Sequence, residues 1–232
     1  ESILARCAGL VSFNGRAFDQ PLLTPRFAMH HQPSPLDGMA HLDLLPAARQ
    51  RWRLRLPSCA MSALEKEILG FQRSEEDVPG WLIPTLYQDY TRTGDGRAVA
   101  RVFYHNREDI ANMVPLAAIL CAPFESRGDA LLRLDIHPVD YVSLGRSFED
   151  LQQPEVAEQA YRLALAATLP DDARAVALER LGNLLKRQER RSEALAVWQD
   201  WITSIPGFHL LPYVELAKHH EWQDADLAAA RK

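Results

Sequence analysis

The chain has 232 residues, enough for one large domain or two modest ones, and a composition (47% hydrophobic, 25% charged) that is ordinary for a soluble globular protein. It has no apolar run of about eighteen residues, which excludes a membrane-spanning helix. The net charge of −5 excludes binding to nucleic acid by overall attraction, so any such affinity must come from a local basic patch or a bound metal.

Three widely spaced cysteines, Cys7, Cys59 and Cys121, argue against a disulfide framework or a zinc knuckle. We expect them to be small buried hydrophobes in a protein of the reducing cytoplasm. Glu1 is not an initiator methionine, and no signal-peptide pattern follows it. We therefore expect the chain to begin inside a longer protein or to have lost its start.

Residues 1–125 alternate apolar runs typical of strands with helical patterns. Asn14-Gly15 ends the first apolar run, Gly70 closes a short helix, and Gly94 breaks the chain before a long one. This order predicts an α/β domain in which helices cover a sheet. The predicted strands are residues 9–13 and 40–45, and the predicted helices are residues 18–30, 46–52, 62–69, 83–90 and 97–120.

From Pro138 to the end the pattern is helical only, and it repeats itself. Two Leu-Gly pairs 37 residues apart are each followed by similarly spaced small and aromatic residues and a proline. The first copy has Leu144, Gly145, Ala157, Tyr161, Ala164 and Pro170, and the second has Leu181, Gly182, Ala194, Trp198, Trp201 and Pro206. This pattern over residues 138–232 resembles the tetratricopeptide repeat, in which paired helices stack. An unrelated helical bundle is the alternative.

A third copy opens at Glu215 and continues into a predicted second helix at residues 226–230, where the chain stops. Because such repeats need a neighbour or a cap over the last apolar face, we expect the carboxyl end to be cut as well.

Two aspartates ninety residues apart, Asp19 and Asp109, are candidate metal ligands. Asp19 lies at a predicted helix start, where interaction with the helix dipole is the structural alternative. Asp109 follows His105 by four residues, so the two side chains share one face of a helix, which is also a common surface contact. Aspartates from separate helices can hold the divalent cations that cleave phosphodiesters. The pair thus predicts two of the three parts of a metal-dependent nuclease site, and the third part would be further acidic ligands.

The segment from Phe13 to Leu23, with Arg26, resembles the second motif of DEDD-type 3′–5′ exonucleases, N-x-x-x-F-D-x-P-x-L. His105-x3-Asp109 resembles their third motif. The resemblance implies that Asp19 and Asp109 bind metal and that His105 is the general base, which contributes on the order of 10²–10⁴-fold in rate. The substrate-binding residues that it implies are Asn14, Phe18, Arg26, Tyr104 and Asn106.

Further segments, among them residues 58–65 and 77–84, narrow the resemblance to the YprB-like proteins, a bacterial branch of ribonuclease-H-fold exonucleases with carboxyl-terminal tetratricopeptide repeats. This implies a 3′–5′ exonuclease of DNA repair, of the mitomycin repair factor B type. Such an enzyme uses Mg²⁺ or Mn²⁺, acts on single-stranded DNA or 3′ ends, and works beside a helicase.

These enzymes also need an amino-terminal Asp-x-Glu, and no such motif precedes Asn14. We therefore expect the chain alone to bind metal weakly and to cleave poorly. The rival hypothesis is a non-catalytic adaptor, in which a degenerate nuclease fold carries a module that binds a partner.

One basic cluster, residues 49–55, is a candidate nucleic-acid contact; its members are Arg49, Arg51, Trp52, Arg53 and Arg55. It is either a solvated helix end or a phosphate-binding stripe in which Trp52 stacks on a base. The region after residue 125 has 13 Lys and Arg against 17 Asp and Glu. We expect its repeats to bind a protein rather than DNA.

Overall fold

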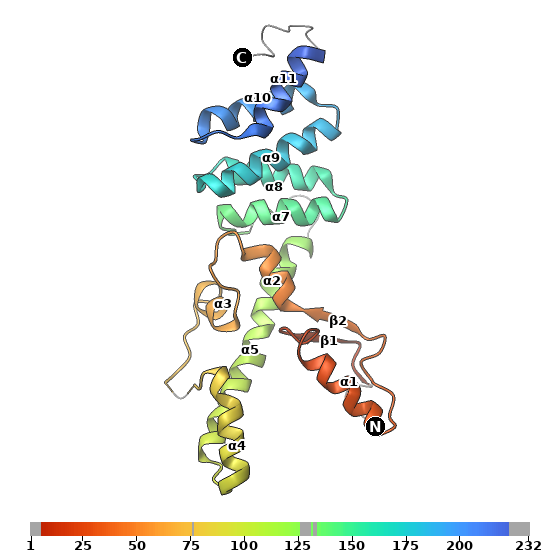
Figure 1. Cartoon of the computed structure of the whole chain (residues 1–232), viewed down its shortest axis with the longest axis vertical. Coiled ribbons are helices and arrows are strands. Elements are labelled where there is room, and N and C mark those ends of the chain that lie inside the picture. The colour runs from red at the N-terminus through yellow and green to blue at the C-terminus, as the bar shows by residue number, and fades with distance from the viewer. Residues whose placement is uncertain (1–5, 76, 126–130, 132–133, 223–232) are drawn as a thin grey trace. The chain divides into compact units, whose positions relative to one another are not determined.

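The computed structural model describes residues 6–75, 77–125, 131 and 134–222 (Figure 1). The chain divides into two compact units. The first consists of Glu1–Arg49 and Leu56–Glu125, and the second consists of Gln50–Arg55 and Ser126–Lys232. None of the described helices is long and apolar enough to cross a membrane.

The sheet of the first unit has two parallel strands in the part of the chain that the structure describes, β1 (Gly9–Ser12) and β2 (Ala40–Asp43). The helix α1 (Asp19–Met29) connects them and buries none of its residues. Both strands and the helix lie where the sequence predicts them, within two residues. The predicted α/β character is therefore present, but α1 does not cover a face of the sheet as we expected.

Helix α2 (Leu44–Trp52) follows β2 without a loop and begins two residues before its predicted start. Its apolar residues recur at the helical period, so they form one buried stripe. The residues of this stripe are Leu44, Leu45, Ala48 and Trp52. The last residues of α2 belong to the second unit and the earlier ones to the first.

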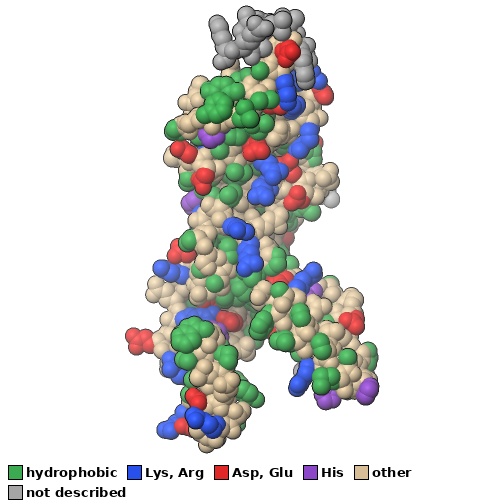
Figure 2. Space-filling view, in the orientation of Figure 1, with side chains coloured by type: hydrophobic (Ala, Val, Ile, Leu, Met, Phe, Trp, Pro, Cys, Tyr) green, Lys and Arg blue, Asp and Glu red, His purple; other side chains and the backbone are tan. Residues whose placement is uncertain are grey.

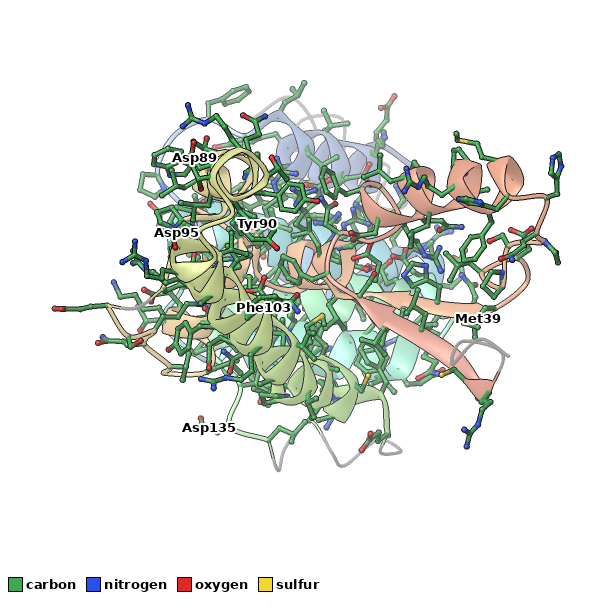
Figure 3. The ribbon with its side chains drawn as sticks, turned by 90° about the horizontal axis from the view of Figure 1, so that it is seen from below. Met39, Asp89, Tyr90, Asp95, Phe103 and Asp135 are labelled. Atoms are coloured by element: carbon green, nitrogen blue, oxygen red, sulfur yellow. The ribbon has the colours of Figure 1, made fainter. Side chains whose placement is uncertain are left out.

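A short helix and a helical hairpin complete the first unit. They are α3 (Met61–Glu67), the 3₁₀ turn η2 (Gly80–Leu82), α4 (Ile83–Thr93) and α5 (Arg97–Glu125). Gly94 ends α4 in the left-handed conformation (φ 75°), which glycine adopts without steric cost. Many large apolar side chains here stay exposed (Figure 2), among them Tyr90 of α4 and Phe103 of α5 (Figure 3).

In the second unit, five helices stack within residues 138–222, which confirms the predicted helical character for this described part (Figure 1). They are α7 (Pro138–Asp150), α8 (Pro154–Leu165), α9 (Asp171–Arg187), α10 (Arg191–Ser204) and α11 (Leu210–Trp222). Glu215, where the third copy opens, lies in α11. The predicted helix at residues 226–230 lies outside the described residues.

The two complete copies share one packing contact between their helices. A Cβ on Gly145 of α7 would lie 2.4 Å from Cε1 of Tyr161 on α8, and a Cβ on Gly182 of α9 would lie 2.4 Å from Cη2 of Trp198 on α10. Each ring is therefore in contact with the backbone of the preceding helix. Because the glycine and the aromatic residue are sixteen positions apart in both copies, the internal repeat of the sequence is also a repeat of structure.

Candidate active site

His105 and Asp109 lie one turn apart on α5, and both side chains are partly exposed. The imidazole Nε2 lies 3.5 Å from Oδ2 of Asp109. The helical spacing thus produces the side-chain pair that the sequence predicts, at a position that solvent can reach. Among the described residues, the side chain of Asp109 is 36% exposed, so a ligand can approach the carboxylate.

Asp77, on the segment between α3 and η2, contacts the other nitrogen of the His105 ring. Its Oδ1 lies 2.8 Å from Nδ1, which donates a hydrogen bond to this carboxylate when it carries the ring proton. In that tautomer Nε2 keeps its lone pair and faces Asp109. Burial alone would raise the pKa of Asp77, but the hydrogen bond from His105 and the charge of Arg73 outweigh it and lower the pKa.

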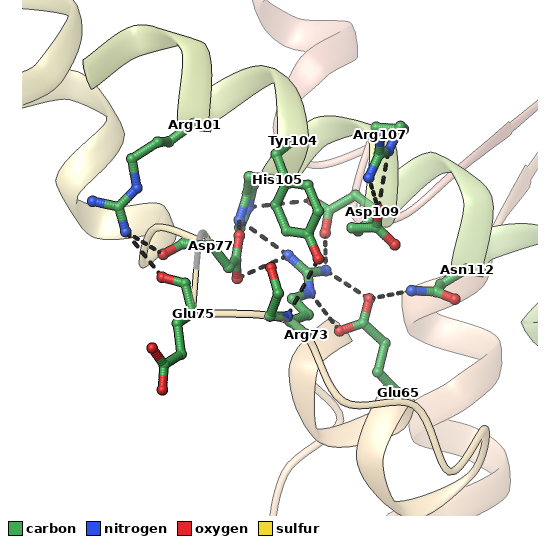
Figure 4. A network of polar contacts seen from close by, with 12 residues as sticks. Glu65, Arg73, Glu75, Asp77, Arg101, Tyr104, His105, Arg107, Asp109 and Asn112 are labelled. Atoms are coloured by element: carbon green, nitrogen blue, oxygen red, sulfur yellow. Dashed lines mark hydrogen bonds and ion pairs between the residues drawn. The ribbon is translucent and has the colours of Figure 1, made fainter. Parts of the chain in front are cut away.

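Arg73 lies at the centre of the polar network around His105 (Figure 4). Its Nε and Nη2 donate to the two carboxylate oxygens of Glu65 at 2.7 and 2.6 Å, and Nη2 also forms an ion pair with Oδ1 of Asp109. Its Nη1 lies 3.0 Å from Nδ1 of His105 and 3.4 Å from Oδ2 of Asp77. Although burial would lower the pKa of Arg73, the hydrogen bonds to Glu65 and Asp109 raise it, so the guanidinium stays charged.

Further hydrogen bonds, from α3 and α5, hold the network in place. Glu65 of α3 is only 1% exposed and accepts a third hydrogen bond, at 2.9 Å, from Nδ2 of Asn112 on α5. Arg101 of α5 donates to the backbone carbonyls of Glu75 and Asp77 at 3.3 and 2.9 Å. These contacts hold the segment that carries Arg73 and Asp77 against the face of α5.

Tyr104 stands beside this network (Figure 4). The phenol oxygen accepts a hydrogen bond from the backbone N–H of Ser74 at 3.3 Å, and Arg107 lies over the ring at 5.0 Å from its centroid. The ring supports the segment at Ser74, whereas His105 makes the direct contacts with Asp77 and Asp109.

The carboxylates around Arg73 are of the kind that binds a hard divalent cation, but they are not arranged around a common cation position. Three carboxylates (Glu65, Asp77 and Asp109) face one guanidinium, so the cluster has a formal charge of −2 with His105 neutral. Carboxylate oxygens are the ligands that Mg²⁺ and Mn²⁺ prefer. Among residues 6–75, 77–125, 131 and 134–222, however, no three His, Cys, Asp or Glu side chains are arranged to hold a metal.

The second predicted motif is on the loop after β1 and on α1. Asp19 is the first residue of α1, as predicted, and Phe18 and Asp19 are exposed. Among the contacts of the described residues, none joins Asp19, Phe18 or Arg26 to His105 or Asp109. The convergence of Asp19 and Asp109 on one cation stays a prediction.

Asp43, which the sequence analysis did not select, holds this loop in place. From the end of β2, its carboxylate accepts hydrogen bonds from the backbone N–H groups of Asn14 (2.7 Å), Arg16 (3.0 Å) and Leu45 (3.2 Å). Asn14 takes a positive φ of 65° there. Asp43 thus fixes the backbone of the Asn-Gly turn that precedes Asp19.

Of the two alternatives for the basic cluster at residues 49–55, the structure contradicts the stacking of Trp52 on a base, and phosphate binding by its exposed arginines stays a prediction. Trp52 is 2% exposed, so its ring cannot stack on a base. Arg51 is buried too, which lowers its pKa to about 10, and its Nε has no hydrogen-bond partner in the part of the chain that the structure describes. Arg55 is held by Asp140 through two hydrogen bonds of 2.9 Å. Only Arg49 and Arg53 remain exposed.

Comparison with known proteins finds a curated relative of this chain. The chain is 27% identical over 223 residues to the uncharacterized protein YprB of Bacillus subtilis (strain 168); the alignment covers 95% of this chain and 52% of that protein. The chain therefore spans about half the length of this curated relative. No solved structure matches the chain significantly.

A family model described as RNase_H superfamily matches residues 1–121, which include the second motif, the Arg73 network, His105 and Asp109. Together with the YprB match, it confirms the predicted resemblance to a YprB-like protein with a ribonuclease-H-type domain, whereas the tetratricopeptide repeats stay a prediction. The helices from α7 onward lie outside this match, which covers more than half of the chain. The chain belongs to the RNase H superfamily.

Proposed function

We propose that this chain is part of a metal-dependent 3′–5′ exonuclease that acts on DNA during repair. The observation that carries the proposal is His105, whose Nδ1 is held by Asp77 and whose Nε2 faces Asp109. A base, a carboxylate that orients it and a second carboxylate near its free nitrogen are groups that metal-dependent hydrolysis of a phosphodiester can use. Membership of the RNase H superfamily supports a nuclease.

In this proposal Asp19 and Asp109 hold Mg²⁺ or Mn²⁺, together with ligands from outside this chain. The cation would supply Lewis-acid stabilisation of the scissile phosphate. His105 would accept the proton of the attacking water at Nε2, while Asp77 holds the Nδ1–H. The terminal nucleotide would be held by Asn14, Phe18, Arg26, Tyr104 and Asn106.

The test is digestion of end-labelled single-stranded DNA by the protein in the full length that its gene encodes. We expect mononucleotides to be released from the 3′ end with Mg²⁺ or Mn²⁺ and not with a chelator. His105→Ala should keep DNA binding and lose on the order of 10²–10⁴-fold in rate. Digestion that is equally fast in a chelator would contradict the proposal.

A non-catalytic adaptor is the second candidate, and one observation favours it. Asp109 already forms an ion pair with Arg73, so the carboxylate has a cationic partner without any metal. If the full-length protein binds DNA or a protein partner but shows no metal-dependent digestion, the adaptor is the better description.

We further propose that α7–α11 are tetratricopeptide-type repeats that recruit a protein partner, for which a helicase is our hypothesis. The equivalent Gly145–Tyr161 and Gly182–Trp198 contacts support a repeat. A cavity of about 510 Å³ opens between α7 and α9, where a peptide could bind. It is lined by Glu149, Glu179, Arg180, Asn183, Lys186 and Arg187.

Two substitutions in this cavity, Arg180→Ala and Asn183→Ala, test the hypothesis. We expect the double variant to lose co-purification with a helicase and to keep the nuclease activity. Retention of the helicase together with weaker, salt-sensitive DNA binding would show that these helices contact DNA instead.

A further inference from the structure

Arg73 differs from the surface arginines of this chain because its place is fixed by a buried partner. Its side chain is 10% exposed, and its two hydrogen bonds to Glu65 are parallel, as in the strongest arginine–carboxylate pairs. Glu65 cannot move to follow it, since Asn112 and the core around α3 hold that carboxylate. The guanidinium is therefore a fixed positive charge in the wall of the site.

This fixed charge is in contact with the carboxylate of Asp109, the proposed metal ligand. Nη2 of Arg73 donates to Oδ1 of Asp109 while it also donates to Oε1 of Glu65. A divalent cation on the same oxygen would lie close to the guanidinium, and two cations that close together repel. The charge of Arg73 therefore weakens the binding of a cation at Oδ1.

Arg73 and Asp77 also favour different tautomers of the His105 ring. Nη1 of Arg73 lies 3.0 Å from Nδ1, and a guanidinium can only donate, so this contact requires the tautomer in which Nε2 carries the proton. Asp77 requires the other tautomer, in which Nε2 is free to accept one. In its present place Arg73 therefore works against both Asp109 as a ligand and His105 as a base.

We propose that Arg73 is a positioning residue of this site: its charge, held in place by Glu65, opposes a divalent cation at Oδ1 of Asp109 and competes with Asp77 for Nδ1 of His105. The inference rests on the proposed function, because it concerns the same Asp109 carboxylate. It adds a residue for which the exonuclease motifs give no role, and it predicts that removing a positive charge strengthens metal binding.

The experiment measures binding of Mn²⁺ alone to the protein in the full length that its gene encodes, by the electron paramagnetic resonance signal of the free ion. We expect Arg73→Met to bind Mn²⁺ at least about tenfold more tightly than the wild type, where tenfold corresponds to about 1.4 kcal/mol. Adding Asp109→Asn to Arg73→Met should abolish the gain. The matched control is Arg92→Met, which removes an equal charge from an exposed ion pair with Asp89 on α4 and should change nothing.

Arg73→Met leaves Glu65 buried without its cation, so a second variant guards against misfolding. In Arg73→Met/Glu65→Gln the buried charge is removed from both partners, and the glutamine oxygen can still accept the hydrogen bond from Asn112. Far-UV circular dichroism and a cooperative thermal transition establish that each variant is folded. The double variant should show the same gain in Mn²⁺ affinity.

The two ways to fail are distinct. If Asp109→Asn weakens Mn²⁺ binding while removal of Arg73 leaves it unchanged or weaker, the role given to Arg73 is wrong and the metal ligand stands. If Asp109→Asn changes Mn²⁺ binding in neither background, the metal site of the proposed function is wrong as well.

Discussion

Nδ1 of His105 lies 2.8 Å from Oδ1 of Asp77, although the two residues are 28 positions apart in the chain. Asp77 is on the irregular segment before η2, and His105 is on α5. Asp109 of the same helix faces Nε2, whereas Asp77 supplies a carboxylate at Nδ1 that orients the ring and holds its proton. When Nδ1 donates its proton to Asp77, Nε2, on the side of Asp109, is the nitrogen that can accept a proton.

Replacing this carboxylate should slow the nuclease without preventing DNA binding. Asp77→Asn keeps the size of the side chain but removes the charge that selects the Nδ1–H tautomer. We expect a loss of about 10–100-fold in the rate of digestion, the range found when a group that orients a metal ligand or a base is removed. DNA affinity and digestion rate are measured together, with Asp89→Asn on α4 as the control. Equal losses in both variants would contradict the role of Asp77.

The depressed pKa of Asp77 makes a prediction about stability at low pH. A carboxyl group whose pKa is lower in the folded state stabilises the protein above its unfolded pKa, about 3.9, and this contribution is lost as the pH falls through the folded value. The wild type should therefore exceed Asp77→Asn in unfolding free energy at pH 7 by more than at pH 3. Urea unfolding at both pH values measures the two differences, and equal differences would contradict the shift.

The Arg55–Asp140 ion pair should be important for the stability of the second unit. Asp140 is buried, and its two oxygens accept hydrogen bonds of 2.9 Å from Arg55. Arg55→Ala leaves that carboxylate buried beside fewer positive charges, so we expect a loss of about 3 kcal/mol in chemical unfolding. Arg53→Ala, which changes an exposed neighbour, should stay within about 0.5 kcal/mol of the wild type. Similar effects for both would show that Asp140 does not depend on Arg55.

The repeat contacts predict that two glycines cannot be replaced by alanine without cost. A Cβ at Gly145 or Gly182 would lie 2.4 Å from a buried aromatic ring, so either the ring or the helix must move. We expect each variant to lose about 1–3 kcal/mol of unfolding free energy, as in other overpacked cores. Gly80→Ala is the control, since no atom lies within 4 Å of its Cβ position. Wild-type stability in Gly182→Ala would mean that Trp198 does not fill this space.

The elements of the fold were largely predictable, because each depends on a local pattern. The period of apolar residues and the capping glycines located α1, α3 and α4 within a few residues, and the strand at residues 9–13 is β1. The burial of Trp52 also follows from a local pattern: Trp52 lies four and eight residues after Ala48 and Leu44, which places it on the buried stripe of α2.

The site was predictable only where it is local. His105 and Asp109 are one helical turn apart, so the sequence shows their proximity. The other members of the network come from α3 and the segment after it, namely Glu65, Arg73 and Asp77. A hydrophobic period along the sequence does not indicate that these residues contact α5. Asp77 belongs to a segment that the YprB resemblance includes, which was a signal for it. Nothing in the sequence singled out Arg73.

The rate at which the Asp109→Asn variant degrades DNA tests the central claim most directly. The substitution removes a ligand charge without changing size, and Asp95→Asn, at an exposed ion pair with Arg97, is the matched control. In the full-length protein with Mn²⁺ and 5′-labelled DNA, we predict that Asp109→Asn shows no digestion above background and retains its thermal transition, while Asp95→Asn digests at the wild-type rate. Digestion by the folded Asp109→Asn protein at the wild-type rate would contradict the claim that this carboxylate serves a metal-dependent nuclease.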